Sequence, residues 1–112
     1  MEYAPGDIFW SDFPSADAGD FKERPVLIVA KVFGDDVIVC MITTKKPRFD
    51  ICIEISNTDF VEGGLATSPS FIRPVRLFTA SPKIFRSKAG RVNGDVLNSV
   101  LEALSKKFNP IG

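Results

Sequence analysis

The side chains in this sequence that are able to take part in chemistry include arginines, lysines, threonines, cysteines and carboxylates, whereas none of the 112 residues is a histidine. Serine triads, histidine-based zinc sites and the histidine pairs of many nucleases are therefore excluded. Any enzyme built from this chain works without imidazole as base, acid or metal ligand.

The two cysteines, Cys40 and Cys52, both lie in apolar runs. This setting favours buried free thiols that pack as small hydrophobic groups over a disulfide. Two cysteines without histidine do not make a closed zinc site unless carboxylates are added. We therefore expect no metal and no cofactor.

The charges are balanced in number but not in position. Residues 1–44 hold eight acids and three bases, whereas residues 63–94 contain six bases and no acid. The acid-free tract predicts either a surface that faces a polyanion or, equally well, a set of ordinary ion pairs with the acidic first half.

Length and composition indicate one domain over residues 1–112, with 45% hydrophobic residues and too many large apolar side chains for a disordered chain. The N-terminus lacks the basic and apolar regions of a signal peptide, and no run approaches a membrane span. We expect a soluble protein in the cytoplasm, without membrane contact.

The elements that must position the charged side chains are mostly strands. Apolar runs and alternation between turn residues predict strands over 7–13, 25–33, 37–43, 50–56 and 70–78, with the second and third joined as a hairpin. The run 25–33 is apolar throughout, which is typical of a central strand covered on both faces. Pro74 lies inside a predicted strand and therefore implies a bulge or an edge position.

The C-terminal part of the chain predicts a helical turn from Pro82 to Arg86, a short strand over 90–92 and a helix over 94–108 with Asn93 as its N-cap. Six apolar residues share one face of this helix: Val96, Leu97, Val100, Leu101, Leu104 and Phe108. The fold class is α+β, mostly β: a small antiparallel barrel closed or buttressed by a C-terminal α-helix.

The order of the motifs resembles one protein family. Gly6-Asp7-Ile8 opens the first strand, Glu23-Arg24-Pro25-Val26-Leu27 opens the second, and Ile42-Thr43-Thr44 closes the third. Gly64-Leu65, then Ser70-Phe71-Ile72-Arg73 and Gly90-Arg91-Val92 follow in the same order. Together they resemble the PemK/MazF family of toxin-antitoxin endoribonucleases over nearly the whole chain.

The resemblance implies an SH3-like barrel that forms a homodimer, cleaves single-stranded RNA such as mRNA without a metal, and is neutralised by a cognate antitoxin protein. Operator DNA is then a partner only through the antitoxin. It also implies that Arg24 and Thr43 are catalytic. In such a reaction the 2′-hydroxyl of the RNA is the nucleophile, so the protein has to align it, relay protons and stabilise charge on phosphorus.

Arginine suits that last role, because its planar fork binds phosphate oxygens and stays charged. Arg73 is the third catalytic candidate. Some family members place an aspartate two residues after the matching arginine, but this sequence has Val75 there, so that general base does not carry over. Glu23 is a candidate general acid or base, with Asp17 and Asp20 as further carboxylates near Arg24.

The residues expected to contact the RNA backbone are Thr44, Lys45, Lys46 and Arg48, which follow Thr43 directly, and Arg76. A solvated basic turn is the alternative for the loop. Phe71 or Phe78 is a candidate for stacking on a base, although most of the ten phenylalanines must be core.

Two other functions stay open. A gyrase poison similar to CcdB would share the barrel but inhibit a protein, whereas the C-terminal Asn-Pro-Ile-Gly lacks the exposed tryptophan tail frequent in such poisons. A catalytically degenerate member that only binds RNA or antitoxin is the third reading, because of Val75.

Overall fold

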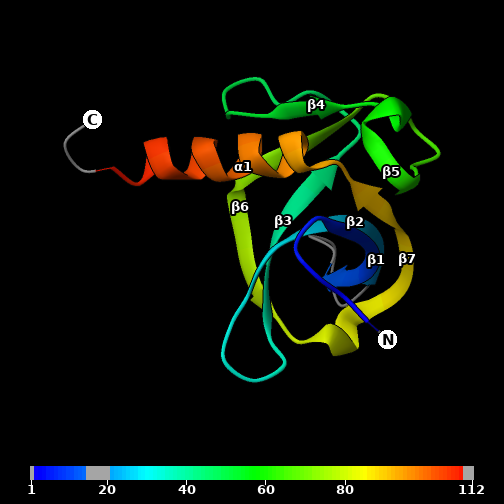
Figure 1. Ribbon diagram of the computed structural model, residues 1–112. Helices are drawn as coiled ribbons and strands as arrows, with labels where there is room; N and C mark the ends of the chain where they lie inside the picture. The colour runs from blue at the N-terminus through cyan, green and yellow to red at the C-terminus, as the bar shows by residue number, and fades with distance from the viewer. Residues whose placement is uncertain (1, 15–20, 110–112) are drawn as a thin grey trace.

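In the computed structural model, which describes residues 2–14 and 21–109, antiparallel strands form one curled sheet with an α-helix across it (Figure 1). The predicted mostly-β, α+β fold with a C-terminal helix is confirmed. The strands are β1 (Asp7–Pro14), β2 (Phe21–Lys31), β3 (Val37–Thr43), β4 (Ile53–Ile55), β5 (Phe60–Gly63), β6 (Ser70–Ala80) and β7 (Phe85–Val92), in the sheet order β4-β6-β3-β2-β1-β7-β5. The helix α1 spans Gly94–Lys107.

The predicted central hairpin is present as β2 and β3, which pair antiparallel around a turn with Gly34 at φ +83°. The predicted limits of its first strand are wrong at both ends. β2 begins at Phe21, so Arg24 lies inside the strand, and it ends at Lys31. Phe33 is fully exposed because it belongs to the turn rather than to a covered strand.

The predicted bounds of three further segments are wrong. The run 50–56 pairs only over β4, the helical turn predicted from Pro82 to Arg86 is a 3-10 turn over Pro82–Ile84, and the strand predicted over 90–92 is the end of the longer β7. The sequence did not predict β5. These segments pair with partners distant in sequence, β4 with β6 and β5 with β7. Short strands carry little periodicity, so their pairing is decided by these tertiary partners.

Of the two arrangements predicted for Pro74, a bulge or an edge position, the bulge is the one observed. Cys40 pairs with Leu77 and Met41 pairs with Arg73, so three residues of β6 are accommodated between two adjacent residues of β3. β6 lies between β4 and β3, which makes it an interior strand. The Cys40 thiol donates a hydrogen bond of 3.6 Å to the Pro74 carbonyl oxygen, which the bulge has removed from the ladder.

The core has two parts, one on each face of the central strands. One part lies between the sheet and α1 and includes Ile8, Leu27, Cys40, Ile42, Ile72, Val96 and Val100. The other lies inside the curl of the sheet and includes Phe9, Phe13, Val26, Ile28, Val39 and Phe85. β2 contributes to both, as its continuous apolar sequence predicted.

Both cysteines are free thiols, as expected. Cys40 is buried, whereas Cys52 is only half-buried, so the prediction of burial fails for Cys52. Burial in the apolar core disfavours the thiolate and raises the pKa of Cys40 from its usual 9.0 to about 12.

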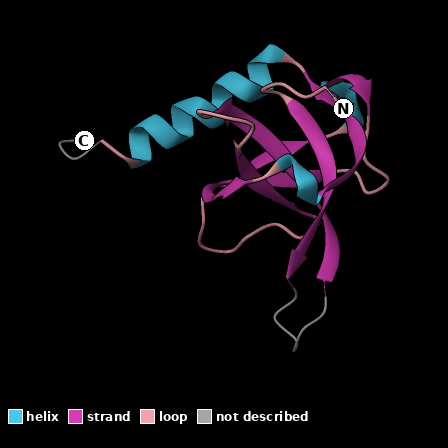
Figure 2. Ribbon diagram, turned by 90° about the horizontal axis from the view of Figure 1, so that it is seen from below, coloured by secondary structure: helices cyan, strands magenta, loops and turns pink. Residues whose placement is uncertain are grey.

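Asn93 caps α1 as predicted, since its side chain accepts a hydrogen bond of 2.9 Å from the backbone N–H of Val96. The predicted apolar face is buried only in part, because Leu101 and Phe108 are exposed. The C-terminal half of α1 extends beyond the sheet (Figure 2), which leaves these side chains without a covering layer. No helix in the described residues is long and apolar enough to cross a membrane.

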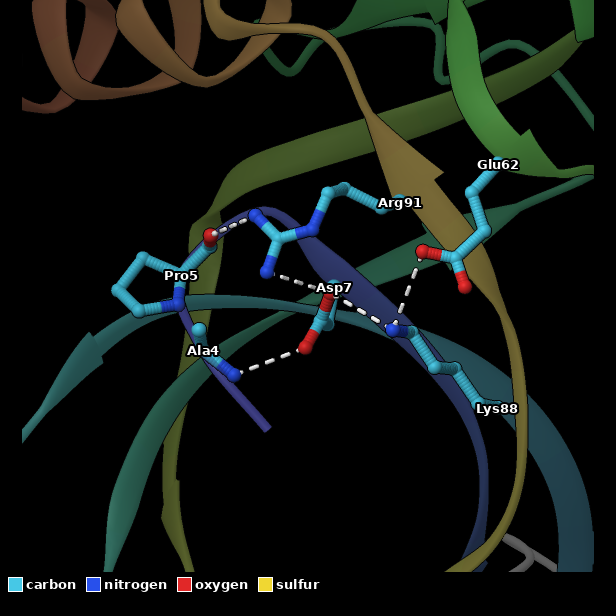
Figure 3. Close-up of polar contacts among 6 residues, drawn as sticks. All are labelled: Ala4, Pro5, Asp7, Glu62, Lys88 and Arg91. Atoms are coloured by element: carbon cyan, nitrogen blue, oxygen red, sulfur yellow. Dashed lines mark hydrogen bonds and ion pairs between the residues drawn. The ribbon is translucent and has the colours of Figure 1, made fainter. Parts of the chain in front are cut away.

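The Asp7 carboxylate ties the N-terminal segment to β7 (Figure 3). One oxygen, Oδ2, accepts a hydrogen bond of 2.8 Å from the Ala4 N–H. The other, Oδ1, lies 3.1 Å from Nη2 of Arg91 and 3.4 Å from Nζ of Lys88. Asp7 is thus the buried acid that neutralises two bases of the acid-free tract.

The rest of that tract follows the same pattern. Arg86 binds Asp12 at 2.7 Å, Lys88 also lies 3.4 Å from Glu62, and Arg73 and Arg76 share another acid, described below. Of the two predictions for residues 63–94, ion pairing is observed for five of the six bases, and Lys83 forms none among the described residues. Only Asp7 and Asp12 belong to the acidic first half, whereas Asp50 and Glu62 lie outside it. The tract as a whole is therefore not a free polyanion-binding surface.

Candidate functional site

A cavity of about 180 Å³ lies at the margin of the sheet and brings together four of the residues singled out from the sequence: Glu23, Arg24, Thr43 and Thr44. The remaining lining residues are Trp10, Pro25, Ile42, Leu65, Ala66, Thr67 and Ser70. Arg24 and Thr43 are half-buried, whereas Glu23 and Thr44 are exposed. The cavity thus places a cation, a carboxylate and two hydroxyls beside an apolar wall.

The strand register explains how these side chains are positioned. Trp10 pairs with Pro25, and Ser11 pairs with Arg24. Because successive side chains point to opposite faces of a sheet, Trp10 and Pro25 share the face under α1, whereas Ser11 and Arg24 share the other face. Residues of both faces border the cavity, which therefore opens where the sheet ends.

Thr43 is the last residue of β3, two positions after Met41, which pairs with Val26 of β2. This spacing places Thr43 on the same face as Arg24. The Thr43 hydroxyl oxygen accepts a hydrogen bond of 3.4 Å from the Lys45 N–H. Since a hydroxyl is both donor and acceptor, its O–H remains available to donate to a phosphate oxygen.

The wall opposite the strands is a loop that sequence reasoning did not assign to the site. The Asn57 side-chain oxygen accepts a hydrogen bond of 3.0 Å from the Leu65 N–H, and the Ser70 hydroxyl donates one of 2.7 Å to the Thr67 carbonyl oxygen. These two bonds fix both ends of the segment 65–70. The sequence signals for it are the turn at Gly63-Gly64 and the family motifs Gly64-Leu65 and Ser70-Phe71, none of which assigned the segment to the site.

Arg73 does not line the cavity. It pairs with Met41 in the sheet, so it shares the face of Arg24 and Thr43. Its Nη2 donates a short hydrogen bond to Oδ2 of Asp50, and Nε of Arg76 lies 3.8 Å from the same oxygen. The structure therefore brings two of the three catalytic candidates to the cavity and holds the third beside them in an ion pair.

The basic turn predicted to contact RNA lies next to Thr43. Lys45, Lys46 and Arg48 are exposed and form no ion pair within the part of the chain that the structure describes. Lys45 directly follows Thr44 in the chain. Thr44 itself borders the cavity.

The aromatic residue at the cavity is Trp10, not either of the two phenylalanines proposed for stacking. Phe71 is buried, so its ring is not presented to a ligand. The Phe78 ring packs against Phe13 with centroids 5.2 Å apart, and Phe78 does not line the cavity. The sequence predicts Trp10 only as part of the first strand, because alternation alone does not show which aromatic side chain borders an opening.

Glu23 is the carboxylate that lines the cavity, whereas Asp17 and Asp20 lie outside the described residues. Val75 lies half-buried in the β6 bulge. Within residues 2–14 and 21–109, no group of three or more cysteine, aspartate or glutamate side chains is arranged to hold a metal ion.

Comparison with known proteins agrees with the fold. The structure is similar to the Mycobacterium tuberculosis toxin MazF-mt6, with a TM-score of 0.70, 20% identity, and coverage of 91% of this chain and 95% of the other. A mycobacterial endoribonuclease gives a TM-score of 0.69 at 16% identity, covering 95% and 91%. The MazE-MazF structure from Deinococcus radiodurans gives 0.69 at 16% identity, covering 92% of each chain.

A mycobacterial endoribonuclease in complex with its cognate antitoxin is also similar, with a TM-score of 0.64, 16% identity and coverage of 95% and 93%. No curated protein sequence matches the chain significantly. The family model for the PemK-like, MazF-like toxin of type II toxin-antitoxin systems matches residues 4–108. This match extends over nearly the whole chain, and the chain therefore belongs to the PemK-like, MazF-like toxin family.

Proposed function

We propose that this protein is the toxin of a type II toxin-antitoxin system and acts as a metal-independent endoribonuclease on single-stranded RNA. The observation that carries the proposal is the meeting of Arg24, Thr43 and Glu23 at one cavity. Similar folds occur in an endoribonuclease and in complexes with an antitoxin, which supports RNA as substrate and an antitoxin as partner. Cleavage of mRNA would stop translation and growth.

In the proposed reaction the RNA 2′-oxygen attacks the adjacent phosphorus while the bond from phosphorus to the 5′-oxygen breaks. The 2′-hydroxyl proton passes to a base, and the departing 5′-oxygen receives a proton, leaving a 2′,3′-cyclic phosphate and a 5′-hydroxyl. Arg24 stabilises the negative charge on the phosphorane oxygens and Thr43 donates a hydrogen bond to one of them. These two groups need no metal ion for that role.

Glu23 is our candidate for the base, because it is the carboxylate among the cavity-lining residues. A carboxylate at hydrogen-bond distance from the 2′-hydroxyl accepts its proton as the oxygen attacks. Trp10 and Leu65 offer an apolar wall on which a base of the substrate packs, and such stacking contributes about 1–3 kcal/mol. Lys45, Lys46 and Arg48 bind flanking phosphates.

The direct test is cleavage of a mixed-sequence single-stranded RNA by Arg24→Ala. We expect a rate reduced by roughly 10²–10³-fold, the usual effect of removing one charge-stabilising donor. Arg86→Ala is the matched control, since Arg86 is an exposed arginine that binds Asp12 and does not line the cavity. Full activity in Arg24→Ala overturns the assignment.

The products and conditions distinguish the alternatives. We expect cleavage to continue in excess EDTA and to leave 2′,3′-cyclic phosphate and 5′-hydroxyl ends, which end mapping detects. Intact RNA together with inhibited gyrase supports a gyrase poison, and RNA binding without cleavage supports a degenerate family member. Sedimentation of the purified protein tests the proposed homodimer.

A further inference from the structure

The bulge in β6 brings two arginines to a single carboxylate. In a regular strand, residues three positions apart point to opposite faces, so Arg73 and Arg76 would diverge. Here the residues after Arg73 leave the ladder between the pairs Met41–Arg73 and Cys40–Leu77. As a result, Nη2 of Arg73 and Nε of Arg76 both approach Oδ2 of Asp50.

Asp50 uses only part of the donor capacity of these two side chains. Both contacts are made to the same oxygen, Oδ2. Nε of Arg73 is buried and has no hydrogen-bond partner among the described residues. Each guanidinium offers five N–H donors in a planar fork, so the pair has unused donors and, with Asp50 counted, a net charge of +1.

The group is also accessible to an external anion. The Asp50 side chain is 34% exposed and the Arg76 side chain 55% exposed. Asp50 belongs to the loop between β3 and β4, which begins with Thr44 and carries the exposed Lys45 and Arg48. The loop therefore approaches β6 through a carboxylate at the protein surface, where exchange for another anion costs little desolvation.

We propose that Arg73 and Arg76 form a binding site for a backbone phosphate of single-stranded RNA, which Asp50 occupies in the free protein. The inference rests on the proposed function and deepens it, because it assigns Arg73 to positioning a flanking phosphate. A phosphodiester presents two non-bridging oxygens and accepts paired hydrogen bonds from arginine. It therefore uses donors that one carboxylate oxygen leaves free.

The first test measures binding rather than cleavage. A fluorescent 2′-O-methyl single-stranded oligonucleotide has no free 2′-hydroxyl and is not cut, so its anisotropy reports affinity alone. We expect Asp50→Asn to bind it about threefold to tenfold more tightly than the wild type, because the competing charge is gone. Arg76→Ala is expected to lower the slope of log affinity against log salt by about 0.7, the contribution of one phosphate contact on a single strand.

Asp12→Asn is the matched control. Asp12 binds Arg86, has 30% side-chain exposure, and its substitution changes the net charge by the same amount. We expect it to alter oligonucleotide affinity by less than twofold, as a remote surface charge does. Asp50→Asn in the Arg73→Ala, Arg76→Ala background is expected to have no effect, which ties the gain in affinity to the two arginines. Circular dichroism verifies that each variant folds. Arg76 is exposed, so we expect Arg76→Ala to fold, and its salt dependence then tests the proposal even if other variants do not fold.

A second readout separates this inference from the proposed function. In Asp50→Asn, inorganic phosphate is expected to shift the Nε–H resonance of Arg73 in nitrogen-15 NMR spectra, with a smaller shift in the wild type. If that shift occurs but the wild type neither binds nor cuts RNA, the anion site stands and the ribonuclease proposal fails. Unchanged or weaker oligonucleotide binding by a folded Asp50→Asn overturns the RNA-phosphate site, as does tighter binding of an acidic peptide alone.

Discussion

Replacement of Asp7 by alanine is expected to destabilise the protein by about 3 kcal/mol. The buried carboxylate accepts the hydrogen bond of Ala4 N–H at 2.8 Å, and an unsatisfied buried donor costs about 1–3 kcal/mol. Its two ion pairs, with Lys88 and Arg91, add at most about 1 kcal/mol each, because those side chains are 33% and 37% exposed.

This estimate lies at the low end of the roughly 3–5 kcal/mol that loss of one partner costs in a fully buried ion pair. The reason is that neither cation is left isolated. Lys88 keeps Glu62 at 3.4 Å, and Nη1 of Arg91 donates to the Pro5 carbonyl oxygen at 3.3 Å (Figure 3). Asp7→Asn retains a side-chain oxygen for Ala4 N–H, so we expect it to cost only about 1–2 kcal/mol.

Urea unfolding at pH 7 measures these differences, and thermal unfolding should show a lower midpoint for Asp7→Ala by about 10–15 °C. Asp12→Ala is the control, because Asp12 makes a more exposed ion pair with Arg86 and should cost less than about 1 kcal/mol. Asp7 does not line the cavity, so RNA cleavage by the folded variant is expected to match the wild type. An Asp7→Ala protein as stable as Asp12→Ala refutes the structural role of this carboxylate.

Two further predictions concern stability. Folding raises the pKa of Cys40 from 9.0 to about 12, so the thiol of the unfolded chain ionises at a lower pH than that of the folded protein. The contribution of this pKa difference to the free energy of unfolding is complete below pH 9 and is lost as the pH rises toward 12. The unfolding free energy should therefore fall up to about 1.4 kcal/mol more per pH unit above 9 in the wild type than in Cys40→Ala, as urea titrations at several pH values will show. Gly90→Ala should prevent close pairing of β5 and β7, because an added Cβ would lie 2.3 Å from the Glu62 carbonyl oxygen. Gly94→Ala is its control, since a Cβ added there has no atom within 4 Å. Equal melting temperatures for the two variants contradict the argument.

The correspondence between expectation and structure at the site has a simple physical origin. The family resemblance selected Arg24 and Thr43, and the two lie on neighbouring strands of a hairpin whose register follows from a short turn, which brings them to the same cavity. Trp10 and the segment 65–70 border the same cavity through pairing and hydrogen bonds distant in sequence. Local patterns do not contain that information.

The sequence by itself determined the mostly-β fold, the central hairpin and the Asn93 cap, because each depends on residues close together in the chain. For Pro74 it left a bulge or an edge position, and the pairing of β6 with the distant β3 decided for the bulge. Its motif order also indicated the family. Only the tertiary structure decided which charges are free. Ion pairs form between segments far apart in sequence, so five of the six bases of the acid-free tract met Asp7, Asp12, Asp50 or Glu62, whereas Lys45, Lys46 and Arg48 remained exposed beside the cavity. The sequence gives the number of charged groups, whereas folding sets the distances between opposite charges and thereby decides which of them are neutralised.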